Sequence, residues 1–373
     1  MEIEKLNGYL MSGDTQVLKV ENGQVKSILN KTLMPLFFKK SLDIEKWLKE
    51  RSIDEHRTNS RMLKKVLRLT ETDDLSTVLH FNAATITDNF WFKEEDGKKL
   101  LYAIDIKFKF NNFSNLALSG NFDEFNKEPS RTPELTNIGS FEKCWKMEDG
   151  KWWLYKTGNK NEIFSEFFVY KLGTFLGFNM ARYEYCEPYI KSLNFTNDNI
   201  NFEPISNIIQ TEDYEENYLL LKEYGKNLAN DYLKMIYLDS LIFNVDRHTK
   251  NYGILRNNKT GEIIDLAPNF DNNISLIARG YPSDLTRKKD GLLSFLYEFL
   301  GNDKIALKNF INLNIPLLNK EDLTSIIKSI PIKVEEDKVI SFILNGQKEI
   351  SSFINKNSES LEEKGMEEDI DEL

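Results

Sequence analysis

Residues 241–253 read LIFNVDRHTKNYG, an apolar run that enters a polar loop. The loop places a carboxylate, Asp246, five residues before an amide, Asn251. A second carboxylate, Asp271, follows 20 residues after Asn251, behind the short stretch IIDLAP at 263–268. Taken alone, such a spacing is more often an ordinary polar turn between two strands. Its meaning therefore depends on what the rest of the chain supplies.

This spacing of Asp, Asn and Asp fits the chemistry of phosphoryl transfer. That reaction needs a carboxylate to orient the attacking hydroxyl and oxygen ligands that hold a hard divalent cation against the phosphates. Asp246 would orient or deprotonate the acceptor, and Asn251 and Asp271 would bind Mg²⁺. His248 could brace a carboxylate as a neutral imidazole, or it could be a packed core histidine. The pattern predicts a catalytic loop followed by a metal-binding loop.

Three features upstream could complete a nucleotide site. Lys156 ends the aromatic strand WWLYK at 152–156, where its ammonium group could hold phosphates or reach solvent. Glu166 lies on an expected helix and could pair with Lys156. The loop TNIGSFEK at 136–143 contains Gly139 and Ser140, whose backbone N–H groups could approach phosphate oxygens. With only one glycine, this loop could equally be a plain turn.

A fourth feature is the segment YLLLKEYG at 218–225, which reads as a short buried strand closed by glycine. Glu223 and Tyr224 stand at its end, and the following link would offer backbone N–H and C=O groups to an adenine edge. We therefore expect Glu223 and Tyr224 at the nucleotide site.

The order of the expected elements indicates an α+β fold with two lobes, a mixed N-terminal lobe and a mainly helical C-terminal lobe. Asn22-Gly23 between two alternating runs predicts a hairpin. We expect a helix within 42–69, two strands around the turn at 148–151, and helices over 162–176 and 230–243. Beyond 292 the pattern is helical, broken at Pro316 and Pro331. The expected domains are an N-terminal α/β segment at 1–130, a nucleotide-binding lobe at 131–225, a helical catalytic lobe at 226–356 and an acidic disordered tail at 357–373.

The composition of the 373 residues, 40% hydrophobic and 29% charged, is typical of a soluble globular protein. A net charge of −10 argues against nucleic acid as an obligate partner. Cys144 and Cys186 are too few for a disulfide framework or a cysteine zinc site. We find neither a signal peptide nor an apolar run that could span a bilayer, so the sequence predicts a cytoplasmic protein without membrane contact, with secretion by a non-classical route left open.

The loops NVDRHTKNYG at 244–253 and APNFD at 267–271 resemble those of the HipA-like serine/threonine kinases, and most closely their compact CtkA-type branch. The similarity extends over residues 136–276. It implies a two-lobed kinase fold that uses ATP and Mg²⁺. One departure is the pair Asn272-Asn273, which follows Asp271 where a glycine is common in the family. On this resemblance, the phosphate loop is Gly139-Ser140-Phe141-Glu142-Lys143 and the ATP-binding lysine is Lys156. The helix acid is Glu166, the hinge acid is Glu223 and the catalytic aspartate is Asp246. The loop that contacts nucleotide and metal includes His248, Lys250 and Asn251, and the metal ligand is Asp271.

The resemblance also implies regulation and partners. The family is known for autophosphorylation just before the phosphate loop, and the corresponding residue is Thr136. Its members often act as toxins or growth regulators paired with a small DNA-binding antitoxin. Such a partner is therefore expected at the family level, together with protein substrates that offer Ser or Thr.

Two other readings stay open. The motif at 246–251 also resembles the catalytic loop of phosphatidylinositol 3- and 4-kinases, so a lipid or small-molecule kinase is the first alternative. The net charge gives no support for a membrane substrate. The second is a catalytically inactive binding module that holds a partner through a basic helix at 57–68. The joint presence of Asp246, Asn251, Asp271 and Lys156 speaks against it.

Overall fold

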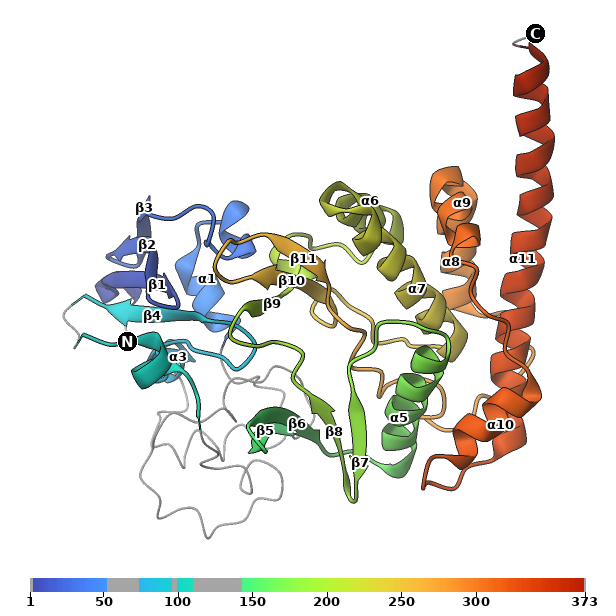
Figure 1. Ribbon diagram of the computed structural model, residues 1–373, viewed down its shortest axis with the longest axis horizontal. Helices are drawn as coiled ribbons and strands as arrows, with labels where there is room; N and C mark the ends of the chain where they lie inside the picture. The colour runs from blue at the N-terminus through green and yellow to red at the C-terminus, as the bar shows by residue number, and fades with distance from the viewer. Residues whose placement is uncertain (1–2, 52–73, 96–98, 110–142, 372–373) are drawn as a thin grey trace. The chain divides into compact units, whose positions relative to one another are not determined.

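The computed structural model describes residues 3–51, 74–95, 99–109 and 143–371 (Figure 1). The chain divides into two compact units. The sheet unit consists of Met1–Gly158, Ala181–Gln210 and Tyr252–Pro268, and the helical unit of Asn159–Met180, Thr211–Asn251 and Asn269–Leu373. All eleven strands found in the described residues belong to the sheet unit. The chain is thus an α+β protein, as the sequence predicted.

The N-terminal part of the sheet unit is a four-stranded antiparallel sheet with the order β3-β2-β1-β4. Asn22 (φ 53°) and Gly23 (φ 70°) both adopt left-handed conformations between β2 and β3, as a tight hairpin turn requires, which confirms the Asn-Gly prediction. Three short helices, at 36–39, 44–49 and 74–80, contribute apolar residues to the core of this sheet. The elements are η1 (Ile3–Lys5), β1 (Gly8–Ser12), β2 (Thr15–Glu21), β3 (Gln24–Ile28), η2 (Leu36–Lys39), α1 (Ile44–Lys49), α3 (Asp74–His80), β4 (Phe90–Glu94) and the π-helix η3 (Tyr102–Ile106).

Two further antiparallel sheets complete this unit. One has the order β5-β6-β8-β7, and its first two strands meet at the turn predicted for residues 148–151. The other has the order β11-β10-β9. In it, β10 begins two residues after Asn251, and β11 ends five residues before Asp271. The strands are β5 (Lys143–Glu148), β6 (Lys151–Lys156), β7 (Tyr183–Cys186), β8 (Tyr189–Leu193), β9 (Ile200–Pro204), β10 (Gly253–Asn257) and β11 (Ile263–Leu266), with η6 (Ile205–Asn207) after β9.

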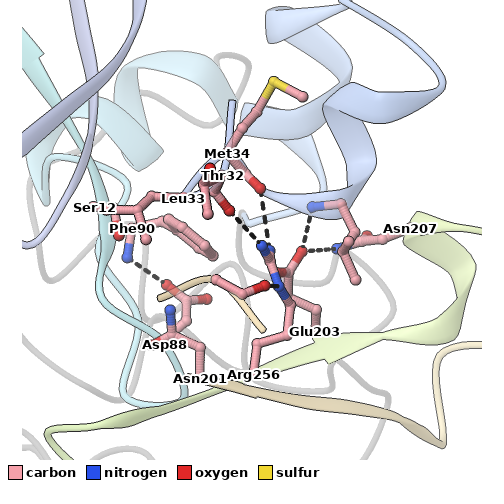
Figure 2. A network of polar contacts seen from close by, with 12 residues as sticks. Ser12, Thr32, Leu33, Met34, Asp88, Phe90, Asn201, Glu203, Asn207 and Arg256 are labelled. Atoms are coloured by element: carbon pink, nitrogen blue, oxygen red, sulfur yellow. Dashed lines mark hydrogen bonds and ion pairs between the residues drawn. The ribbon is translucent and has the colours of Figure 1, made fainter. Parts of the chain in front are cut away.

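A buried ion pair joins the N-terminal part of the sheet unit to β9 and β10 (Figure 2). Arg256 and Glu203 are each 3% exposed and bond directly to one another. The Arg256 guanidinium also donates to the carbonyls of Thr32 and Met34, at 2.9 and 3.1 Å. Glu203 accepts from the backbone N–H of Leu36 at 2.6 Å. Because buried charges require such partners, the segment at 32–36 is an integral part of this unit.

The helical unit contains seven helices, most of which begin at a capping side chain. Asn159 and Glu162 form a capping box at the start of α5, and Asp213 accepts from the N–H of Glu216 in α6. The helices are α5 (Lys160–Phe175), α6 (Tyr214–Tyr224), α7 (Lys226–Ile242), α8 (Gly291–Asn302), α9 (Lys304–Asn312), α10 (Lys320–Lys328) and α11 (Glu336–Asp371). These confirm the helices predicted over 162–176, over 230–243 and beyond 292.

The strand predicted at 218–225 is wrong, because these residues form the last two turns of α6. A short apolar run does not distinguish a strand from a helix by itself. Here Tyr218 and Leu221, three residues apart, are fully buried, whereas Leu219 is 44% exposed. This is the burial pattern of one helical face. The chain leaves the sheet unit after Gln210, and Gly225 lies between two helices of the helical unit.

The disordered tail predicted at 357–373 is also corrected, since α11 continues to Asp371. The segment contains several glutamates, which are good helix formers, and no proline after Pro331. The prediction weighed the self-repulsion of these acids but not their helix propensity. Across the described residues, no helix is both long and apolar enough to cross a membrane.

Candidate active site

The loop that carries Asp246 and Asn251 starts where α7 ends. Phe243 stops the helix in a left-handed conformation (φ 55°, ψ 54°), and its N–H donates to the carbonyl of Asp239. The N–H of Asn244 donates to the same carbonyl at 2.9 Å. The Asn244 side chain then accepts from the N–H of Asp246 at 3.2 Å. The buried helix therefore ends within the apolar run at 241–243, and a polar loop fixed by hydrogen bonds follows directly.

Arg247 holds this loop to the one that carries Asp271. Its guanidinium donates to the carbonyls of Asn251 and Phe270 at 2.8 and 2.9 Å. It also donates to the side-chain oxygens of Asn269 and Asn272 at 3.0 and 2.7 Å. Its charge is balanced by the carboxylate of Asp239 on α7, which it contacts at 2.8 and 3.0 Å. All five donor hydrogens of arginine can serve such a junction, and lysine could not reproduce it.

The side chain of Asn251 has a defined orientation. Its Nδ2 donates to the carbonyl of Asp246 at 2.9 Å, and its backbone N–H donates to the carbonyl of His248 at 2.8 Å. Because the amide nitrogen is engaged, Oδ1 is the atom of Asn251 that is left to bind a cation. An amide oxygen is a hard ligand of the type that Mg²⁺ accepts.

Asp271 adopts a left-handed backbone conformation (φ 60°), which non-glycine residues rarely do outside special sites. The following Asn272 is fully buried, and its Oδ1 accepts from Arg247 and, at 3.4 Å, from Asn244. The asparagine that departs from the glycine common in the family thus has a structural role here. It fixes the position of the chain immediately after Asp271.

The pKa of Asp246 is shifted by its surroundings. Burial raises the pKa of Asp246 above its ordinary value, and the negative charge of Asp271 adds to this rise. The neighbouring His248, Arg247 and Arg279 lower the same pKa in part. A carboxylate whose pKa is raised by a second carboxylate marks a place where a cation would be favourable.

The donor set therefore fits Mg²⁺. Asn251 offers Oδ1 and Asp271 offers a carboxylate, from two loops that Arg247 ties together. Within the described residues there is no cluster of three or more His, Cys, Asp or Glu side chains suited to a metal. A site of the kinase type does not need one, because its other ligands are phosphate oxygens and water.

The remaining predicted site residues lie in different places. In the helical unit, Glu166 is buried on α5 and Lys250 is exposed. Nδ1 of His248 accepts from the N–H of Lys250 at 3.2 Å. Lys156 belongs to the sheet unit, where it ends β6, is 5% exposed and lies over the ring of Tyr183.

For two groups of predicted residues, the structure does not supply the local geometry on which the sequence prediction relied. Glu223 and Tyr224 end α6, so they do not form the extended link that an adenine edge would require. Their place at the nucleotide site stays a prediction without that argument. Gly139, Ser140 and the autophosphorylation candidate Thr136 lie outside the described residues.

Sequence reasoning missed four residues that shape the site. Arg247, Asp239 and Asn272 form the polar junction described above, and Glu212 accepts from the N–H and hydroxyl of Thr249 in the catalytic loop at 3.2 and 3.3 Å. The sequence did contain one sign of this junction. Asp239 is a carboxylate within the apolar end of α7, and Arg247 follows it by eight residues. The partners from 269–272 carry no such signal, since they become neighbours only in the fold.

No known family description matches this chain, and no curated protein matches it either. Among solved structures, HipA of the Shewanella oneidensis MR-1 toxin–antitoxin system, in complex with HipB and operator DNA, aligns with a TM-score of 0.53. The alignment covers 94% of this chain and 98% of that chain, at 13% sequence identity. The Helicobacter pylori proinflammatory kinase CtkA aligns with 57% of this chain and 91% of its own, at 20% identity and a TM-score of 0.43.

The alignment with HipA spans nearly the whole of both chains, whereas a TM-score of 0.43 is too low for the CtkA alignment to define a fold. The mixed α/β architecture and the alignment agree with the expectation from the sequence motifs. The protein has a HipA-like kinase fold.

Proposed function

We propose that this protein is an ATP- and Mg²⁺-dependent kinase that transfers the γ-phosphoryl group to Ser or Thr of a protein. The observation that carries the proposal is the junction at Arg247. It joins the loop of Asp246 and Asn251 to the loop of Asp271, so that a base and two metal ligands belong to one fixed assembly. A protein that only binds a partner has no physical need of this assembly.

In the proposed reaction, the hydroxyl oxygen of the acceptor forms a bond to the γ-phosphorus while the bond to the β–γ bridging oxygen breaks and ADP leaves. Asp246 orients the hydroxyl and receives its proton. Asn251 and Asp271 would hold Mg²⁺, which would supply positive charge to neutralise the phosphates. Lys156 is proposed to hold the nucleotide phosphates, and Glu166 is proposed to position Lys156.

The test is transfer from γ-labelled ATP in the presence of Mg²⁺ to the protein itself, to generic protein acceptors and to phosphatidylinositol vesicles. We expect label on protein, and Asp246→Asn should reduce transfer by about two to four orders of magnitude, the usual contribution of a general base. Asp246→Asn should retain nucleotide binding, whereas Asp271→Asn should weaken Mg²⁺-dependent binding.

Asp337→Asn is the matched control, because Asp337 is 90% exposed on α11 and forms only a surface ion pair. It should behave as the wild type. If lipid alone is labelled, the protein is a lipid kinase. If wild type and Asp246→Asn are equally active, the assignment of the base is wrong, and if no acceptor is labelled, the binding-module alternative is favoured.

Two further parts of the proposal concern regulation. We propose Thr136 as an autophosphorylation site, which mass spectrometry after incubation with Mg²⁺-ATP would detect. The aligned HipA is solved with HipB and operator DNA. We propose a similar small DNA-binding antitoxin as partner, and a growth-regulating role for this chain. Co-expression with a candidate partner should relieve growth arrest caused by the wild type, whereas Asp246→Asn should cause no arrest.

A further inference from the structure

A cavity of about 380 Å³ lies in the helical unit, next to the proposed base. Val245, which directly precedes Asp246, forms part of its wall and is 44% exposed. The segment at 274–290, which follows the loop of Asp271, supplies most of the rest. Apolar side chains that line the cavity include Phe243, Val245, Leu276, Ala278, Pro282 and Phe342.

The charged groups of the lining differ in how they are engaged. Arg287 is buried and pairs with Asp290 at 2.5 Å. Asp284 accepts from the N–H and hydroxyl of Thr286 at 2.8 and 2.7 Å. Arg279, in contrast, is exposed, and it forms no hydrogen bond or ion pair with any residue in the described part of the chain. An arginine in this state is available to a carboxylate from outside.

Arg279 is also close to the proposed base. It lines the same cavity as Val245, the residue directly before Asp246. Its positive charge also favours the ionised form of Asp246. A molecule that presents its hydroxyl to Asp246 therefore meets an apolar cavity and an available guanidinium close to the reacting atoms. An extended peptide can fill both at once, because its side chains on either side of the acceptor are a few ångströms apart.

We propose that this cavity is the acceptor-binding site, and that it selects protein segments in which the Ser or Thr is flanked by an apolar side chain and by an acidic one. The apolar side chain occupies the cavity, and the carboxylate pairs with Arg279. This inference rests on the proposed function, since it names the class of acceptor used by the same site.

The experiment uses the full-length protein and peptides with one central Ser, in which an apolar residue and either Glu or Lys occupy each flanking position in turn. Transfer is measured with Mg²⁺-ATP, and binding by fluorescence anisotropy with a non-hydrolysable ATP analogue. We expect the wild type to prefer Glu at one position by about tenfold in kcat/KM, with the difference in KM. Arg279→Glu should abolish this preference and favour the peptide with Lys.

Lys288→Glu is the matched control, because Lys288 is exposed in the same segment but does not line the cavity. It should keep the preference for Glu. ATP turnover without peptide should be unchanged in Lys288→Glu. For Arg279→Glu the readout is the ratio of its kcat/KM values for the Glu and Lys peptides, which cancels any change in turnover common to both. The combination of Arg279→Glu with the Lys peptide separates peptide recognition from a general loss of structure. An unfolded variant would gain no activity toward any peptide.

Each possible result supports or contradicts the inference, the proposed function or both. If the wild type transfers phosphate to peptides or proteins without preference for an acidic flank, the inference fails and the proposed function stands. If Arg279→Glu raises the KM for ATP and that for peptide alike, Arg279 serves the nucleotide and the inference fails. If the wild type transfers nothing but binds the acidic peptide through Arg279, the docking site stands and the proposed function fails. Absence of both binding and transfer overturns the two together.

Discussion

At the scale of single residues, the candidate site combines energetically unfavourable aspartates with an arginine whose hydrogen bonds are all satisfied. Asp246 is partly buried, the charge of Asp271 raises its pKa, and its side chain forms no hydrogen bond with the described residues. Asp271 adopts a left-handed backbone. Arg247, by contrast, has every donor direction used. Such a division, with unfavourable placements at the two aspartates and satisfied hydrogen bonds behind them, is common at functional sites.

Asp246→Asn should stabilise the folded protein at neutral pH while removing activity. Folding raises the pKa of Asp246, so the protonated form is favoured in the folded state, and the ionised form present at neutral pH opposes folding. The neutral amide removes this opposition. Thermal unfolding without metal should show a higher Tm for the variant at pH 7. The gain should shrink as the pH falls through the raised pKa of folded Asp246, and it should be lost below the ordinary pKa of an aspartate, where wild-type Asp246 is neutral in both states. An equal gain at all pH values would contradict this explanation.

Arg247→Lys should weaken Mg²⁺-dependent nucleotide binding by about 10- to 100-fold, the usual effect of changing a group that orients metal ligands. The lysine keeps a positive charge beside Asp239 but cannot donate to both loops at once. Titration calorimetry with ADP at several Mg²⁺ concentrations would measure the change. Arg182→Lys, at an exposed ion pair with Glu184, is the control and should leave binding unaltered.

At the scale of elements, α11 and α7 are joined by Arg287. Its guanidinium donates to the carbonyls of Ser240 and Leu241 at 2.6 and 2.8 Å, which belong to the last turn of α7 before the catalytic loop. Cations at this end of a helix stabilise it. Gly346 of α11 makes room for this contact, since a Cβ there would lie 2.8 Å from Nη1 of Arg287.

Gly346→Ala should therefore destabilise the protein by about 1–3 kcal/mol, the usual effect of overpacking a well-filled site. Gly301→Ala in α8 provides the comparison, because nothing lies within 4 Å of a Cβ added there. It should instead stabilise by about 0.5–1 kcal/mol, as alanine has the higher helix propensity. Urea unfolding of both variants measures the difference. If both substitutions stabilise to the same extent, Arg287 is not held as described.

At the scale of the whole molecule, long-range polar contacts decide which segments belong together. Arg256 of β10 donates to the carbonyl of Thr32, 224 residues away in the sequence. Figure 2 shows how Glu203 and the backbone at 32–34 surround the same guanidinium. The N-terminal segment is thereby built into the sheet unit through β9 and β10, whose sheet also contains the strands next to both active-site loops.

Arg256→Met should destabilise the sheet unit by about 3–5 kcal/mol, because Glu203 would stay buried without its counter-ion. Lys320→Met removes an ion pair whose partners are 63% and 90% exposed, and should change stability by less than about 1 kcal/mol. Denaturant unfolding followed by far-UV circular dichroism would compare the two. Similar small losses would show that Arg256 is not needed to neutralise Glu203.

The sequence by itself determined the features whose causes are local. Asn22-Gly23 specified a hairpin because both residues tolerate a left-handed backbone. The spacing of Asp246 and Asn251 placed both residues in one short loop after a helix, as the structure has them. Only the tertiary structure decided that the apolar run at 218–225 is a helix, because the faces buried in α6 depend on neighbours distant in sequence. Likewise, the partners of Arg247 lie up to 25 residues away, and no local rule relates them. Polar networks close only when the chain has folded, so the residues that position this site were visible in the sequence while their roles were not.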